Sequence, residues 1–140
     1  MNKASPFDIL LVEPSNLLRR TVSLTVRSLG TAEVTEAATY QSAQQVAGQR
    51  RFDSAVIALE WPPRGDTCEG LTLIHQLRLG RCASPPAIPI AVLVDSCDTT
   101  LLQLLRASDI SRILIKPFRV RDVIDTIAGM RERARGAASA

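Results

Sequence analysis

Short apolar runs alternate with longer segments of helical periodicity along this chain, and this alternation restricts its possible folds more than any other feature. The runs are Ile9–Val12, Ala55–Leu59, Ile88–Val94 and Ile113–Ile115, with a more polar candidate around Val34. Continuous apolar runs of this length are typical of parallel strands that are covered on both faces. They are far shorter than the roughly 20 residues that a membrane-spanning helix needs.

Helical spacing of apolar residues fills the intervals between these runs. The expected helices cover residues 18–29, 39–50, 71–78, 99–107 and 120–127. Gly30 fits the end of the first of them, and Asp98 or Thr99 offers an oxygen that can cap the fourth. Strands and helices that alternate in this way predict an α/β sandwich with a parallel sheet and right-handed crossovers.

The 140 residues are expected to form a single domain, residues 1–140, with a core over about residues 7–128 and a loose basic tail at 129–140. Apolar types make up 46% and charged types 22% of the chain, which excludes a disordered protein. The first residues lack the apolar stretch of a secretory signal, so we expect a cytoplasmic location and no membrane span.

Positive charge is concentrated towards the C-terminus. From Arg112 onward there are seven basic and three acidic side chains, whereas the preceding residues carry ten basic and eleven acidic ones. Such a basic end can bind an acidic protein or a nucleotide phosphate. The alternative is that it is only a solvated helix face without a ligand. Three widely spaced cysteines and one histidine provide neither a disulfide framework nor a zinc motif.

Several segments resemble the receiver domain of bacterial response regulators, the CheY-like branch of the flavodoxin-like fold. The residues that carry the resemblance are Phe7–Glu13, Phe52–Pro62, Glu69–Leu71 and, most tellingly, Ile113–Phe118, an apolar strand that ends in Lys-Pro-Phe. The similarity covers nearly the whole chain. It implies a three-layer sandwich of five helices around a five-stranded parallel sheet in the order 2-1-3-4-5. It also implies a cis peptide bond before Pro117.

The chemistry of the family shows why departures from its pattern matter. Receivers accept a phosphoryl group on an aspartate and hold Mg²⁺ with an acidic pair, that aspartate and a backbone carbonyl two residues further on. A lysine and a hydroxyl contact the phosphoryl group. In this chain Glu13 and Lys116 are retained. Pro14 replaces the second acidic residue, and Ala58 replaces the acceptor aspartate. Val94 replaces the hydroxyl residue, and Ile113 replaces the aromatic switch residue.

Glu60 is an alternative occupant of the acceptor position. Ala58 fits the spacing from Pro14 without a gap, whereas Glu60 needs two extra residues before it and two fewer before Pro62. In that second register the chain is an active receiver, or Glu60 reaches Lys116 and imitates a phosphoryl charge constitutively. Lys116 with Glu13 is either a vestigial site or an ion pair that offsets desolvation.

The resemblance therefore predicts a stand-alone atypical receiver that is not an enzyme, uses no metal or cofactor, and acts by phosphorylation-independent contact with a kinase, an effector or a second copy. The face that receivers commonly use comprises the fourth helix, fifth strand and fifth helix, here Leu102, Arg106, Arg119, Arg121 and Asp122. Leu101, Leu104 and Leu105 are expected to face the sheet and to leave Leu102 towards solvent. Across a twofold axis, Arg119 or Arg121 can pair with Asp122.

A second hypothesis is that the basic end binds an anionic small molecule such as a cyclic dinucleotide through its arginines. Nucleic-acid binding is not expected, because the chain has no separate recognition-helix module.

Overall fold

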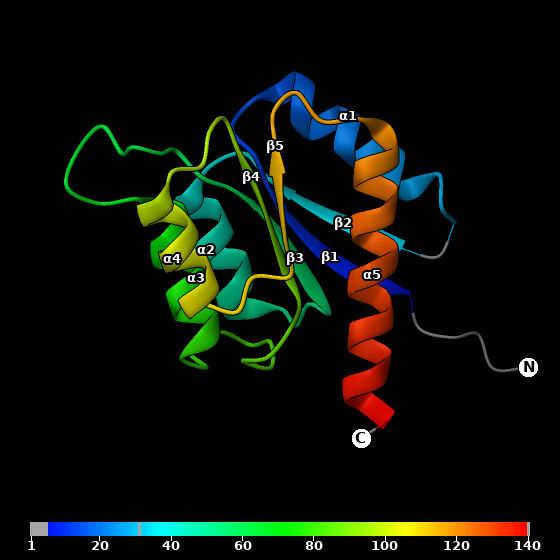
Figure 1. The fold of residues 1–140 in the computed structure, drawn as a ribbon. Helices are drawn as coiled ribbons and strands as arrows, with labels where there is room; N and C mark the ends of the chain where they lie inside the picture. The colour runs from blue at the N-terminus through cyan, green and yellow to red at the C-terminus, as the bar shows by residue number, and fades with distance from the viewer. Residues whose placement is uncertain (1–5, 31, 140) are drawn as a thin grey trace, which may run out of the picture.

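The computed structural model describes residues 6–30 and 32–139, and it has the expected alternation of strands and helices (Figure 1). The strands are β1 (Phe7–Val12), β2 (Ala32–Ala37), β3 (Ser54–Ala58), β4 (Ile90–Val94) and β5 (Arg112–Ile115). The helices are α1 (Asn16–Arg27), α2 (Tyr40–Gln49), α3 (Glu69–Arg78), α4 (Thr99–Ala107) and α5 (Val120–Ser139). All neighbouring strands are parallel, in the order β2-β1-β3-β4-β5, which confirms the predicted flavodoxin-like topology.

Helices cover both faces of the sheet, with α2, α3 and α4 on one side and α1 and α5 on the other (Figure 1). Along β3, Ala55 and Ile57 belong to the core on the α2–α4 side, whereas Val56 and Ala58 belong to the core under α1 and α5. Because both faces of the strand are buried, it is apolar at successive positions instead of alternating with polar residues. Ala58 is therefore a core residue of the α1–α5 side.

Polar side chains cap several of the helices at their first turn. Ser15 and Thr39 accept hydrogen bonds from backbone N–H groups of α1 and α2, and Asp98, one of the two caps that the sequence predicted, does the same for α4. At the start of α5, the Asp122 carboxylate accepts from the Arg119 N–H at 2.9 Å. These bonds pair amide groups that have no partner within the helix.

Most element boundaries differ from the prediction by one or two residues, and two of the differences have a clear physical reason. Strand β4 begins at Ile90 instead of Ile88, because Pro89 has no N–H group to donate to the ladder. The tail that was expected to be loose from residue 129 continues α5 as far as Ser139, and Met130 is fully buried against the sheet. Its alanine, arginine, glutamate and methionine residues favour a helix. No helix in the described ranges is long and apolar enough to cross a membrane.

Arg78, the last residue of α3, joins three segments at the amino-terminal edge of the sheet. Its guanidinium donates to the carbonyl oxygens of Pro86 (2.7 Å) and Ile88 (2.7 Å) in the α3–β4 loop. It also donates to those of Ser108 (2.9 Å) and Asp109 (3.0 Å), just after α4. This single side chain therefore pairs backbone acceptors of two loops that are far apart in sequence.

Candidate functional site

The residues carried over from the receiver pattern meet at the carboxyl edge of the sheet. Glu13 follows β1, Ala58 and Val94 end β3 and β4, and Lys116 follows β5. Ala58 is paired with Leu93 in the neighbouring strand, so the ends of β3 and β4 lie level. Both Ala58 and Val94 are buried. In open parallel sheets, this edge is where functional sites form.

The ion pair expected between Glu13 and Lys116 is present. The Lys116 Nζ lies 2.8 Å from Glu13 Oε1, and the glutamate is almost completely buried. Its other oxygen, Oε2, accepts a hydrogen bond from the Ser15 N–H at 2.9 Å, and Arg19 donates to the Glu13 carbonyl at 2.9 Å. Oε1 accepts no hydrogen bond within the described part of the chain, so the ammonium is its polar partner. The chain's own carboxylate thus neutralises the lysine.

Two backbone carbonyls, one at the end of β3 and one just beyond it, accept hydrogen bonds from side chains. The Tyr40 hydroxyl donates to the carbonyl of Ala58, and the Cys68 thiol donates to the carbonyl of Glu60 at 3.5 Å. Burial is the largest of the causes that raise the pKa of Tyr40 well above its ordinary value, so the hydroxyl stays protonated as a donor. Counting from Ala58, the Glu60 carbonyl is the one that the receiver pattern assigns to the metal.

The side chain of Glu60 pairs with a residue of its own loop. It is exposed and pairs with Arg64, whose Nε lies 2.9 Å from Glu60 Oε1. The constitutive-phosphomimic alternative requires Glu60 against Lys116, whereas the structure pairs Lys116 with Glu13. In the structure Glu60 thus pairs with Arg64 instead of Lys116, and the occupant of the acceptor position stays a prediction.

The residues at this edge do not fit the divalent cation of the family. Mg²⁺ needs several oxygen ligands, and Glu13 is the one carboxylate retained, already shared between an ammonium and an amide. The side chains of Pro14, Ala58 and Val94 contain no heteroatom. Within residues 6–30 and 32–139, no three His, Cys, Asp or Glu side chains are grouped to hold a metal ion.

The long loop between β3 and α3 is held against the molecule by Trp61. Its indole Nε1 donates to Asp98 Oδ2 at 3.0 Å, and its ring packs against the core on the α2–α4 side. The backbone N–H of Leu101, and then the Trp61 bond, hold the pKa of Asp98 below its usual value. The peptide bond before Pro62 is cis, and so is the predicted one before Pro117. Trp61 is thus an intramolecular anchor between this loop and α4.

The predicted contact face is only partly as expected. Arg106, Arg119 and Arg121 are exposed, but Asp122 is half-buried and already bonded to the first turn of its own helix. Leu102 is half-buried, and Leu104, expected against the sheet, is the more exposed leucine. The two residues lie on opposite flanks of the stripe that buries Leu101 and Leu105, so packing by neighbouring elements decides which flank is covered.

Sequence reasoning missed two exposed aliphatic residues on the same face. Ile115 on β5 is 53% exposed and Val120 at the start of α5 is 56% exposed. Ile113, at the position of the family's switching aromatic, is half-buried and packs against the core on the α2–α4 side. Tyr40, Arg19 and Cys68 were also missed, because their partners at the carboxyl edge lie outside any local pattern.

No protein-family model matches the chain, and no curated protein matches it by sequence. Solved structures do match it. A CheY-like response regulator receiver domain protein from Methanospirillum hungatei JF-1 superposes with a TM-score of 0.81 at 16% identity, covering 95% of this chain and 99% of that one. The chain has the receiver fold. The signal receiver domain of an HD domain-containing protein from Pseudomonas fluorescens Pf-5 shares this fold with a TM-score of 0.78 at 20% identity, covering 94% and 98% of the two chains.

The chemotaxis protein CheY4 of Vibrio cholerae has the same receiver fold, with a TM-score of 0.75 at 24% identity over 89% of this chain and 98% of its own. These neighbours are signalling proteins. At such identities the likeness establishes the fold, and the site has to be judged by its own residues.

Proposed function

We propose that this chain is a receiver-like signalling module that is not phosphorylated on an aspartate and acts in the cytoplasm through contact with another protein. The observation that carries the proposal is Ala58 at the carboxyl end of β3, where phosphoryl transfer needs a carboxylate nucleophile. Pro14 and Val94, without side-chain donors or ligands, point the same way. Together, these three substitutions remove the nucleophile, one acidic metal ligand and the hydroxyl group that contacts the phosphoryl group.

The ion pair of Lys116 with Glu13 supports the same conclusion. In a working site, the lysine has to stabilise charge on an incoming phosphoryl group. Here the ammonium lies 2.8 Å from a buried carboxylate of the same chain. Both groups belong to the folded domain, so this ion pair forms without a phosphodonor and does not depend on phosphorylation.

Incubation with acetyl phosphate and Mg²⁺ is expected to leave the mass of the intact protein unchanged, because no carboxylate occupies the acceptor position. Intact-protein mass spectrometry measures the outcome. The triple variant Pro14→Asp, Ala58→Asp, Val94→Thr is the matched control, since it restores the missing groups, and an acid-labile adduct on it shows that the donor is active. A stoichiometric adduct on the unaltered chain would overturn the proposal, and its loss in Glu60→Gln would assign the acceptor to Glu60 instead.

The contact surface that we propose is the face formed by α4, β5 and α5. It presents the exposed aliphatic side chains of Leu104, Ile115 and Val120 together with exposed arginines. Exposed aliphatic groups ringed by charge are a common composition of binding surfaces. The positive charge suits an acidic surface on a kinase or an effector, whereas a second copy of the chain would pair Arg119 or Arg121 with Asp122.

Charge reversal at Arg121 is expected to weaken self-association through this face by on the order of tenfold, because the pairing of Arg121 with Asp122 across the twofold axis then becomes a repulsion between like charges. Sedimentation velocity over a range of concentrations measures the dissociation constant. The control is Arg20→Glu, the same charge change at an exposed residue of α1. Equal sedimentation of the two variants, or a monomer at every concentration, would contradict a homodimer through α4, β5 and α5.

A further inference from the structure

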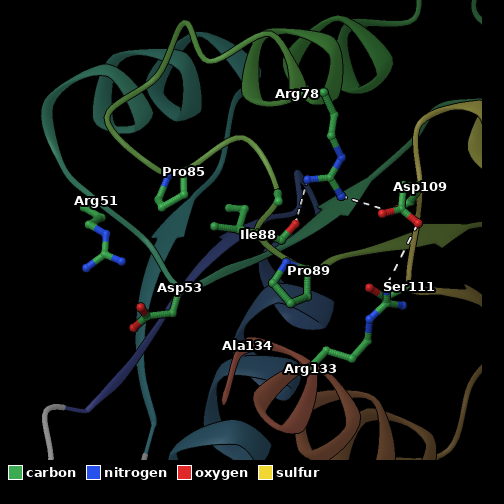
Figure 2. A pocket seen from close by; sticks show the side chains of 11 residues that line it. Arg51, Asp53, Arg78, Pro85, Ile88, Pro89, Asp109, Ser111, Arg133 and Ala134 are labelled. Carbon is green, nitrogen blue, oxygen red and sulfur yellow. Dashed lines mark hydrogen bonds and ion pairs between the residues drawn. The ribbon is translucent and has the colours of Figure 1, made fainter. Parts of the chain in front are cut away.

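We propose that a pocket at the amino-terminal edge of the sheet binds a small organic anion with an apolar body (Figure 2). This edge lies at the opposite end of the strands from the Glu13–Lys116 ion pair, so the inference goes beyond the proposed signalling role. The pocket has a volume of about 360 Å³, within the usual size of small-molecule sites. Its walls come from the segment before β3, the end of α3, the α3–β4 loop, the turn before β5 and the C-terminal half of α5.

The first observation is a pair of hydrogen-bond donors on the pocket wall that have spare capacity. Arg133, on α5, has Asp109 as its ion-pair partner, with 3.9 Å between Nη2 and Oδ1, and both residues are exposed. Such a long, solvated pair contributes little stability. The Oγ of Ser111 is buried and has no hydrogen-bond partner in the described part of the chain. Because buried hydroxyls are normally paired, an acceptor group at this point would satisfy it.

The second observation is the apolar surface beside these donors. Pro85, Ala87, Ile88 and Pro89 line the pocket from the α3–β4 loop, and Ala134 lines it from α5 (Figure 2). The loop is held in place by the hydrogen bonds that Arg78 donates to its carbonyls, described above. The apolar wall is thus preorganised and can cover a ring or an alkyl group while the anionic end meets the polar side.

The charges around the pocket favour an anion over a cation. Arg51, Arg78 and Arg133 line it together with two carboxylates, those of Asp53 and Asp109, which leaves an excess of positive charge. Asp53 Oδ2 already accepts a hydrogen bond from the backbone N–H of Asp8 in β1, at 2.9 Å. Arg133 is one of the arginines of the basic C-terminal end, so the pocket gives that end a specific role in ligand binding.

The test is a two-dimensional ¹H–¹⁵N NMR titration of the intact chain with benzoate and with phenyl phosphate, which share an apolar ring and differ in the anionic group. Saturable shifts are expected at the amides of residues 85–89, Ser111 and Arg133. Replacing Arg133 by glutamine is expected to weaken binding by about tenfold, through loss of a charge-assisted hydrogen bond. The matched control is Arg20→Gln, which makes the same charge change on α1 and is expected to bind as the unaltered chain does.

Three other outcomes would each contradict the proposal. It is overturned if neither compound gives saturable shifts up to about 10 mM, a weak limit even for a fragment-sized ligand. Equal weakening by Arg133→Gln and Arg20→Gln would show attraction by net charge alone. Inorganic phosphate as effective as phenyl phosphate would show a site for simple ions without the apolar component. None of these results depends on whether the chain is phosphorylated.

Discussion

Replacing Arg78 by methionine is expected to destabilise the fold by about 3 kcal/mol, which corresponds to a fall in Tm of about 10 °C for a domain of this size. The methionine keeps much of the aliphatic stem but has no donors. Four carbonyl oxygens, at 2.7–3.0 Å from the guanidinium, then lose their partner together. The expected loss of stability is smaller than the summed free energies of four separate hydrogen bonds. Arg78 is only half-buried, so some of these carbonyl oxygens can accept a hydrogen bond from water instead.

Thermal and urea unfolding of three variants test this prediction. Arg81→Met is the matched control, since Arg81 is an exposed residue just beyond α3, and its Tm is expected to change by less than about 2 °C. Arg78→Lys is expected to lie between the two, because one ammonium cannot reach four divergent acceptors. If Arg78→Met is as stable as Arg81→Met, the four hydrogen bonds of Arg78 do not stabilise the fold, and the prediction is wrong.

Replacing Lys116 by methionine is expected to cost about 3 kcal/mol or more, because it leaves the buried Glu13 carboxylate without its counter-charge. The reverse change, Glu13→Gln, is expected to cost less, since the lysine side chain is 23% exposed and can be hydrated. The double variant Glu13→Gln, Lys116→Met is expected to recover much of the loss, because it has no charge left to bury.

Urea unfolding of the four proteins gives the coupling between the two residues in a double-mutant cycle. A coupling free energy of about 2 kcal/mol or more is expected for a pair of which one member is buried. Additive effects of the two substitutions would show that the pair makes no net contribution. In that case the support that this contact lends to the proposed function is lost, whereas the mass-spectrometric test at Ala58 remains separate.

Much of the fold was predictable because it depends on local patterns. A buried parallel strand is apolar at every position, whereas a helix has an apolar residue at every third or fourth position. Both patterns can be recognised in the 140 residues of this chain. A cap of α4 by Asp98 or Thr99 and an ion pair as one of two interpretations of Glu13 and Lys116 were also predictable, and the cis bond before Pro117 followed from the receiver resemblance. The predicted end of α5 was wrong, because the alanine and arginine residues beyond residue 129 are good helix formers and extend the helix to Ser139.

The amino acid sequence by itself determined the order of strands and helices, and the absence of oxygen-bearing side chains at Pro14, Ala58 and Val94. Only the tertiary structure decided that Glu60 meets Arg64 and that Tyr40 meets the Ala58 carbonyl. It also decided that Arg78 joins two distant loops around a pocket. The reason is physical. Periodicity depends on neighbours along one helix or strand, whereas these contacts depend on how separate elements pack against each other.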